Sequence, residues 1–369
     1  MKKEKTLFTE KVESEALAQF ESAMAQDFVV KGALMPDAHK GYSLPIGGVV
    51  ATKDFILPAW VGYDIGCGMC AIQTSYPPAH INQHRSQIFQ EIYKYIPTGF
   101  KHNQKNRKWD HSHLDRSDNL DQIFEKNGLK QLCSLGSGNH FIEIGKDEKR
   151  QVWIIVHSGS RNLGHTVATH YMRLASGDGK AREGHYGFDV DSKNGRNYIK
   201  DMNFCLEFAL ENRKQILTKV LEIINEIVPR RPREPIDPTG IINRNHNHAE
   251  LYEGMWIHRK GATQARKGML GVVPGNMRDG SFIVEGLGNP DSLWSSSHGA
   301  GRVLGRKKAK KQLSLEDFKG TMKGIKAKVA ASTLDESPFA YKNIFQIMEQ
   351  QKMLIRTLHH VSPIINVKA

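Results

Sequence analysis

Residues 28–75 read FVVKGALMPDAHKGYSLPIGGVVATKDFILPAWVGYDIGCGMCAIQTS, and this stretch decides the expected fold. Short apolar runs alternate here with glycines, prolines and small polar residues. Runs of this length, bounded by turn residues, are typical of buried β-strands. We therefore expect several strands of a central sheet, with Asp64 and Cys67 in a turn that follows one of them.

Helical spacing of apolar residues is the main signal in the rest of the chain. The expected helices are residues 15–26, 83–95, about 163–174, 198–228, 315–330 and 339–359. Strands are expected at residues 140–144 and 152–157 and within residues 253–286. The stretch VPRRPREPIDP (residues 228–238) is the best linker candidate, but it does not separate two self-sufficient halves. We therefore expect one intertwined domain over residues 1–369.

Composition restricts the class of protein and its partners. Of the 369 residues, 39% are hydrophobic, which is enough for a core and excludes a globally disordered chain. The net charge of +13 favours a polyanionic partner such as nucleic acid, although a lysine-rich surface gives the same charge. No early apolar run is long enough for a signal peptide or membrane span, so we expect a cytoplasmic protein. Four cysteines are too few for a disulfide framework, which leaves thiols free to bind metal.

A carboxylate and a thiol flank the tight turn Asp64-Ile-Gly-Cys67, where both could face one metal ion. A thiolate has several lone pairs and can bridge two ions. The same residues also fit a structural aspartate in a turn beside a buried cysteine. Cys67 and Cys70 form a CxxC pair, but a second pair is missing, which disfavours a four-thiolate zinc site. The pair also lacks the flanking pattern expected of a redox site.

Three histidines stand beside small polar residues. They are His140 in SLGSGNHFIE, His157 at the end of VWIIVH, and His246 in NRNHNHAE. Taken singly, each also fits a hydrogen-bonded structural histidine. With Asp64 and Cys67 they form a mixed nitrogen, oxygen and sulfur set, which suits Mn²⁺, Zn²⁺ or Co²⁺ better than Mg²⁺ or Ca²⁺.

His298 lies in the small-residue stretch SSSHGAGR (residues 295–302). Gly299 and Gly301 let the backbone approach a bulky anion, and Arg302 can hold its oxygens in a planar fork. A histidine here can attack phosphorus and carry a nucleotide covalently, although the stretch also fits an ordinary glycine turn. The chain has no Walker A sequence, which argues against P-loop nucleotide chemistry.

Other basic segments fit anion binding or simple surface charge. Residues 35–49 combine an aspartate, a histidine and a lysine with a glycine-rich turn, and residues 259–263 place two cations beside a glycine. The runs at residues 230–233 and 307–311 could contact a nucleic-acid backbone, or they could be solvated surface.

In this order the motifs resemble those of the RtcB family of GTP-dependent RNA ligases. The matching segments are MPDAHKGYSLPIGGV, GYDIGCG, LGSGNHFIE, VHSGSRNLGH, the pair His246-Asn247, HRKGAT, VPGNM, SSSHGAGR, ESPFAYKNI and SPIINVK. They run in family order from about Met35 to Lys368 and cover nearly the whole chain. The resemblance implies an α+β fold with central mixed or antiparallel β-sheets flanked by helices.

The resemblance also implies a role for each matched residue. His298 would be the nucleophile that takes GMP from GTP, with Asp37 supporting it from behind. Two Mn²⁺ ions, bridged by the cysteine, would be held by Asp64, Cys67, His140, His157 and His246. The nucleotide pocket would include Asn139, Glu143, Asn247, Gly275, Asn276, Met277, Ser281, Tyr341 and Lys368. The weaker candidates for phosphate contacts are Arg161, Asn212 and Arg302.

The implied reaction joins RNA ends that carry a 3′-phosphate or 2′,3′-cyclic phosphate to 5′-hydroxyl ends, through a histidine–GMP intermediate. RNA is then the expected partner, in splicing or repair, with an archease as a helper and no membrane. Two alternatives stay open: a metal-dependent RNA cyclic phosphodiesterase that needs neither His298 nor GTP, and an RNA-binding protein without turnover. The presence of both His298 and the ligand set favours the ligase.

The sequence departs from the family pattern at a few positions. Ser297 precedes His298 where many members have cysteine, and Gly66 stands where some have asparagine. Cys70 replaces an arginine of those members. We expect the loss of that arginine to remove a local contact, and Cys70 to add a thiol near the metal ligands.

Overall fold

The computed structural model describes residues 3–9, 11–228 and 240–369. Within them the fold is α+β, with two large β-sheets, two short two-stranded sheets and flanking helices, as the sequence predicted. The predicted linker and the basic run at residues 230–233 lie, apart from Val228, outside the described residues. In the described part of the chain, none of the helices is both long and apolar enough to cross a membrane.

The first large sheet has five strands. Their order is β1 (Glu4–Leu7), β2 (Val29–His39), β3 (Ile46–Thr52), β11 (Met255–Lys260) and β10 (Asn247–Tyr252). Strand β1 is parallel to β2, and the other neighbours are antiparallel. Two of the strands expected within residues 28–75, β2 and β3, are present here, because these apolar runs are buried between turn residues. The expectation of a strand before Asp64 is wrong: that run forms only the two-residue β4 (Phe55–Ile56) and then the short helix α2 (Pro58–Val61), which begins at a proline.

The second large sheet has eight strands. Seven lie in the order β13 (Leu270–Pro274), β14 (Ser281–Gly286), β17 (Ile355–Lys368), β6 (Phe141–Lys146), β7 (Val152–Ser158), β5 (Gly68–Thr74) and β9 (Ile242–Asn245). The eighth, β16 (Lys326–Ala327), pairs in parallel with β17. The short sheets pair β12 (Ala262–Gln264) with β15 (Ser295–Ser297) and β4 (Phe55–Ile56) with β8 (Phe188–Asp189).

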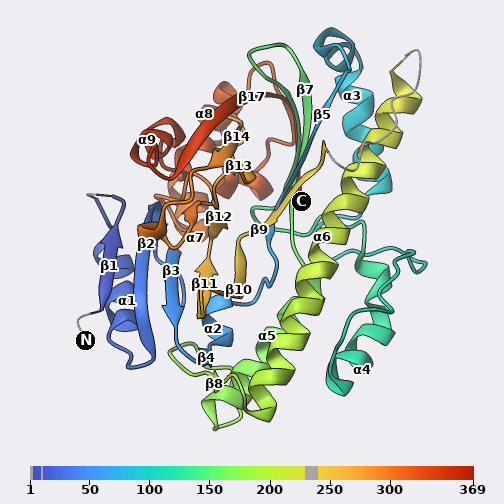
Figure 1. Cartoon of the computed structure of the whole chain (residues 1–369). Helices are drawn as coiled ribbons and strands as arrows, with labels where there is room; N and C mark the ends of the chain where they lie inside the picture. Colours follow the sequence, from blue (N-terminus) through green and yellow to red (C-terminus); the bar gives the residue numbers. More distant parts are fainter. Residues whose placement is uncertain (1–2, 10, 229–239) are drawn as a thin grey trace.

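Helices cover the outer faces of these sheets (Figure 1). They are α1 (Ser14–Met24), α2 (Pro58–Val61), α3 (Pro78–Tyr95), α4 (Asp118–Asn127), α5 (Arg161–Ser176), α6 (Lys193–Ile227), α7 (Arg306–Gln312), α8 (Leu315–Thr321) and α9 (Ile344–Gln350). Figure 1 shows α6 along one side of the molecule, with α1 and β1 at the opposite side. Four helices predicted from spacing, those near residues 15–26, 83–95, 163–174 and 198–228, are confirmed.

The long helix α6 organises the core behind the second sheet. Its N-cap, Ser192, accepts a hydrogen bond from the N–H of Gly195 at 3.0 Å. Its apolar stripe buries residues such as Phe204, Phe208 and Ile216 against strands β5 and β7 and helices α3 and α5. This packing fixes the strand ends that carry the candidate ligands.

Two helix predictions near the C-terminus are wrong. Residues 339–359 form only the short helix α9, and the chain then enters β17 at Ile355. Strand β17 is stabilised by pairing on both sides with β14 and β6, and these distant partners override the local helical spacing. Helix α8 ends at Thr321 rather than near Ala330, because Gly324 follows with a φ of +86° and β16 begins soon after.

Candidate active site

A buried carboxylate holds His298 in the turn that follows β15. Nδ1 of His298 donates a hydrogen bond to Oδ2 of Asp37 at 2.7 Å, and the backbone N–H of His298 donates to the same oxygen at 3.2 Å. Asp37 is fully buried in β2, whereas His298 keeps 14% of its side chain exposed and lines a cavity. Because a carboxylate only accepts hydrogen bonds, the proton of neutral His298 lies on Nδ1. The lone pair of Nε2 is therefore free to react.

A glycine lets this turn lie directly against β2. Gly301 has a φ of +73°, and a Cβ atom there would come within 2.2 Å of the backbone oxygen of Asp37. A larger residue would push the turn away from β2 and lengthen the bond between Asp37 and His298. The sequence suggested Gly301 as a point of anion approach, but here it serves the approach of a strand.

Three predicted metal ligands from distant parts of the sequence meet in space. Sγ of Cys67 lies 3.3 Å from Nε2 of His140 and 3.2 Å from Nε2 of His157. Cys67 is in the turn before β5, His140 directly precedes β6, and His157 belongs to β7. The ligand atoms lie within 4.8 Å of one another, close enough to surround a metal ion.

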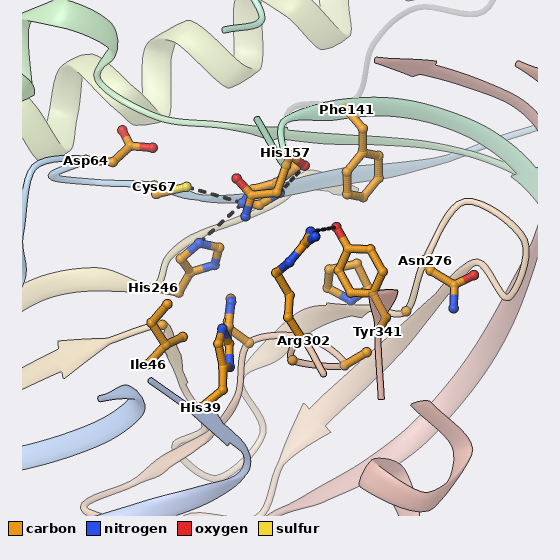
Figure 2. Close-up of a pocket in the computed structure, with 18 of the residues that line it drawn as sticks. His39, Ile46, Asp64, Cys67, Phe141, His157, His246, Asn276, Arg302 and Tyr341 are labelled. Atoms are coloured by element: carbon orange, nitrogen blue, oxygen red, sulfur yellow. Dashed lines mark hydrogen bonds between the residues drawn. The ribbon is translucent and has the colours of Figure 1, made fainter. Parts of the chain in front are cut away.

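Asp64 and His246 extend this group on two sides. Oδ2 of Asp64 lies 3.0 Å from Nε2 of His140, and Nε2 of His246 lies 3.3 Å from Nε2 of His157. The ring of His246 also neighbours that of His298, with centroids 4.8 Å apart. The five predicted ligands therefore converge into one ligand cluster, which reaches His298; Figure 2 shows four of them.

Backbone carbonyls set the tautomer of two of these histidines. Nδ1 of His140 donates to the carbonyl of Leu135 at 3.0 Å, and Nδ1 of His157 donates to that of Asn139 at 3.1 Å. When each histidine is neutral, with its proton on Nδ1, its Nε2 lone pair faces Cys67. In metal sites, a hydrogen bond from the ring nitrogen that does not bind the metal orients the histidine in this way. Nδ1 of His246 is buried without a hydrogen-bond partner among the described residues. The residues fit a divalent ion of borderline softness.

Burial keeps His157 and His246 neutral and the thiol of Cys67 protonated. Burial, reinforced by neighbouring histidines, lowers the pKa values of His157 and His246 well below the usual range. Burial, together with the nearby Asp64 carboxylate, raises the pKa of Cys67 well above its usual value. Burial would also raise the pKa of Asp64, but the protonated form of His140, which would donate from Nε2, outweighs it together with Cys67 and Arg161 and lowers that pKa. A bound divalent ion would displace the proton of Cys67.

The ligand cluster and His298 border a cavity of about 490 Å³. This volume lies in the range of protein pockets that hold small molecules. All the predicted nucleotide-binding residues line it, namely Asn139, Glu143, Asn247, Gly275, Asn276, Met277, Ser281, Tyr341 and Lys368. In Figure 2, Asp64 lies on one side of His157 and Tyr341 on the other, so the lining of the cavity extends to both sides of His157.

A buried carboxylate, Glu336, organises the end that contains Tyr341. It accepts hydrogen bonds from Nζ of Lys368 and from the hydroxyl of Tyr341, the latter at 2.7 Å. It also pairs with Arg306 at 2.6 Å and Arg302 at 3.2 Å. Burial raises the pKa of Glu336, but the charges of Lys368 and Arg306 prevail and lower it to about 2. Lys368, Arg302 and Arg306 all line the cavity, so this end attracts anionic groups.

Glu143 offers an unpaired acceptor in the same region. It is almost completely buried; Oε2 accepts a hydrogen bond from Asn366 at 3.3 Å, but Oε1 has no partner within the described ranges. Burial raises the pKa of Glu143 to about 8, against the opposing charge of Lys368. A buried polar atom without a partner costs free energy, which a ligand that donates a hydrogen bond would recover.

The remaining predicted nucleotide residues form one wall of the cavity. Gly275 donates its N–H to the carbonyl of Gly280 at 2.7 Å, which closes the turn that holds Asn276 and Met277. Oγ of the adjacent Ser281 is buried without a hydrogen-bond partner among the described residues. Asn247, at the start of β10, links two other segments: its amide accepts from the N–H of Gly261 at 2.8 Å and donates to the carbonyl of Asp64 at 3.2 Å.

Two of the three predicted phosphate contacts lie outside the cavity lining. Asn212 is fully buried, and its amide makes hydrogen bonds to the loops that carry His140 and His157. Arg161 donates to a serine hydroxyl and a backbone carbonyl, and its charge contributes to the lowered pKa of Asp64. Asn212 therefore supports the ligand loops, and Arg161 lies behind Asp64.

Sequence reasoning missed Lys260, which lines the cavity, and Glu336, which binds residues of its lining. Glu336 lies in the matched segment ESPFAYKNI, but nothing in that segment shows that cations approach it from elsewhere. In the sequence, Lys260 is recognisable only as one of two cations beside a glycine in residues 259–263. Its Nζ donates to the carbonyl of Val61 at 2.9 Å, and burial lowers its pKa to about 8 beside Asp64 and Cys67.

The structure accommodates the departures from the family pattern. Gly66 has a φ of +74°, and a Cβ atom there would lie 2.8 Å from Cβ of Ala209, so glycine fits where a larger residue would not. Cys70 lies in the apolar core against α6, where burial raises its pKa to about 12. It does not line the cavity and does not join the ligand cluster.

The chain matches the family described as tRNA-splicing ligase RtcB over residues 19–121 and 110–369. It belongs to the RtcB family. The RNA-splicing ligase RtcB of Escherichia coli K12 is 34% identical over an alignment of 387 positions. This alignment covers 97% of this chain and 95% of the relative. The tRNA-splicing ligase RtcB of Nanoarchaeum equitans is 30% identical over an alignment of 415 positions, which covers 88% of this chain and 85% of the relative. The resemblance to RtcB drawn from the ordered motifs is thus confirmed.

Proposed function

We propose that this RtcB protein is an RNA ligase that uses GTP and Mn²⁺. It would join an RNA 3′-phosphate or 2′,3′-cyclic phosphate end to a 5′-hydroxyl end, in RNA splicing or repair. The relatives described above carry the names RNA-splicing ligase and tRNA-splicing ligase. One observation carries the proposal: Nδ1 of His298 is bonded to buried Asp37, which leaves Nε2 free in a cavity beside the ligand cluster.

We assign two Mn²⁺ ions to the ligand cluster, with Cys67 as the bridging residue. The support is the approach of its sulfur to two ring nitrogens whose tautomers are set by backbone carbonyls. When bound, the ions neutralise phosphate charge and polarise phosphorus–oxygen bonds.

The first step is nucleophilic attack by Nε2 of His298 on the α-phosphorus of GTP. A phosphorus–nitrogen bond forms, the bond from that phosphorus to the bridging oxygen breaks, and pyrophosphate leaves. Asp37 holds the ring by Nδ1 and stabilises the positive charge that the ring gains. Arg302 and Arg306, both on the cavity wall, would attract the triphosphate.

We place the guanine base at the end of the cavity that contains Tyr341. Guanine carries both hydrogen-bond donors and the O6 acceptor. Glu143 has a free oxygen for the donors, Lys368 can donate to O6, and Tyr341 offers a ring for stacking. In this proposal the walls around the nucleotide come from Asn139, Asn247, Gly275, Asn276, Met277 and Ser281.

RNA then takes the GMP from His298. An oxygen of the RNA 3′-phosphate attacks the GMP phosphorus, the phosphorus–nitrogen bond breaks, and His298 is released. A 5′-hydroxyl next attacks the RNA phosphorus and GMP leaves, because GMP is a better leaving group than a phosphate monoester oxygen. A 2′,3′-cyclic phosphate must first be opened by water. We infer that the reaction takes place in the cytoplasm; an archease helper stays a prediction.

The proposal is tested by incubating the protein with MnCl₂ and GTP labelled with ³²P at the α-phosphate. We expect an acid-labile, base-stable label, which His298→Ala abolishes and His359→Ala, a remote control, retains. A label that survives in the His298→Ala variant would refute the assignment. An unlabelled wild-type protein that still opens cyclic phosphates would support the alternative phosphodiesterase.

A further inference from the structure

Three aromatic rings from distant segments line the same cavity. Tyr42 lies in the turn between β2 and β3, Tyr63 directly precedes Asp64, and His165 belongs to α5. The rings of Tyr63 and His165 are stacked, with centroids 5.0 Å apart and planes at 22°. Tyr42 meets Tyr63 edge-on, with centroids 6.0 Å apart. We call these three rings the aromatic ladder.

The aromatic ladder lies at the end of the cavity away from the proposed guanine site. Tyr63 is the chain neighbour of Asp64, and Tyr42 falls between His39 and Ile46 in the sequence. Figure 2 shows Asp64, His39 and Ile46 on one side of Arg302, with Tyr341 on the other. Because Tyr63 contacts both other rings, the ladder lies on the Asp64 side of the ligand cluster, whereas Tyr341 of the proposed guanine site lies on the other side.

The ladder is held in place but left open to solvent. The side chain of Gln19 donates to the carbonyls of Gly41 and Tyr42 and accepts the N–H of Gly41 at 3.0 Å. These bonds fix the turn, yet the side chain of Tyr42 is 62% exposed. An exposed ring on a fixed backbone contributes little to the core, but it is ready to receive a flat ligand at small entropic cost.

Three flat rings suit a base as the ligand. Bases stack on aromatic side chains with little regard to sequence. The face of Tyr42 is open for such stacking.

We propose that the aromatic ladder binds the base of the 3′-terminal nucleotide of single-stranded RNA and so places its 3′-phosphate beside His298. The inference rests on the proposed ligase function. The 3′-phosphate must meet the GMP on His298 while guanosine fills the opposite end, so its nucleotide extends toward the ladder. The 5′-hydroxyl strand is needed only after that phosphate is activated. The substrate is then RNA with an unpaired 3′-terminal nucleotide.

The test measures the KM for a single-stranded RNA 3′-phosphate and, separately, the KM for the 5′-hydroxyl strand. Tyr42→Ala should raise the first by about 5- to 150-fold, the usual effect of one lost base stack. Tyr42→Phe keeps the ring and should stay close to the wild type. Tyr95→Ala is the matched control, because Tyr95 is also exposed, at 44%, but does not line the cavity.

A second experiment uses an RNA whose 3′-terminal nucleotide lacks its base. In the wild-type protein this RNA should show the same rise in KM, and Tyr42→Ala should add little to it. An unchanged KM for Tyr42→Ala, or a rise confined to the 5′-hydroxyl strand, would overturn the inference. Labelling of His298 by GTP is followed in parallel: if it fails in the wild type, the ligase proposal fails, whereas a normal label with an unchanged KM rejects only the ladder.

Discussion

The hydrogen bond between Asp37 and His298 makes the reactivity of His298 depend on one buried carboxylate. In Asp37→Asn the carboxamide has nearly the same size but no charge, and its NH₂ group can donate to Nδ1 of His298. The ring proton would then move to Nε2, the atom that must attack phosphorus. We therefore expect Asp37→Asn to slow GMP transfer to His298 while the protein stays folded.

The expected magnitude follows from the 2.7 Å bond. A hydrogen bond to a charged group contributes about 1.5–3 kcal/mol, so loss of the charge alone lowers the rate by about 10- to 150-fold. Tautomer reversal adds to this; in the serine–histidine–aspartate triad the same substitution costs about 10⁴-fold. We expect a total decrease of about 10²- to 10⁴-fold.

The assay is a single-turnover measurement of ³²P label on the protein at saturating GTP and Mn²⁺. ¹⁵N NMR of the histidine ring reports which nitrogen of His298 carries the proton. Asp147→Asn is the control, because Asp147 is also buried and accepts a hydrogen bond from Trp153 at 2.9 Å, away from the cavity. A folded Asp37→Asn variant that labels within threefold of the wild-type rate would refute the reasoning.

Two further predictions concern the ligand cluster and the buried carboxyl of Glu143. Cys67→Ser should lower manganese affinity at least tenfold by loss of the bridging sulfur, and elemental analysis after dialysis checks this; unchanged manganese content argues against bridging. Folding raises the pKa of Glu143 from 4.5 to about 8, so its protonation favours the folded state. This contribution to the stability of the protein is complete below about pH 4.5 and is lost as the pH rises to 8. Between pH 5 and 8 the Tm of the wild type should therefore fall relative to Glu143→Gln; parallel curves would contradict the shift.

The sequence predicted β2, β3 and α6 because their signals are local, whereas β1 and β10 of the first large sheet were not predicted. Apolar runs between glycines and prolines in residues 28–75 suit strands, and the apolar spacing of α6 suits one buried face. Strand β17 was not predicted, because its conformation depends on pairing with β14 and β6, which are distant in sequence. No pattern within residues 355–368 could reveal those partners.

The candidate site shows the same division between local and distant information. The types of the metal ligands were visible, since Cys67, His140 and His157 stand in turns or at strand ends beside small residues. The sequence did not show that these ligands lie close together in space, nor that the carboxylate of Glu336 contacts Lys368. The resemblance named Asn212 as a phosphate contact, but only the structure shows its amide committed to backbone loops.

The position of the site at the junction of the two large sheets explains why no single segment could define it. Cys67 and His157 belong to the second sheet or its turns, whereas Asp37 belongs to β2 of the first. His246 lies between them: its N–H donates to the carbonyl of Cys67 at 2.7 Å, and its carbonyl accepts from the N–H of Ala262 at 3.1 Å. These hydrogen bonds tie the turn of Cys67 to β12, whose partner strand β15 directly precedes His298, so they also set the distance between the ligand cluster and His298. A substitution that shifts one sheet against the other would separate nucleophile from ligands even with every site residue intact.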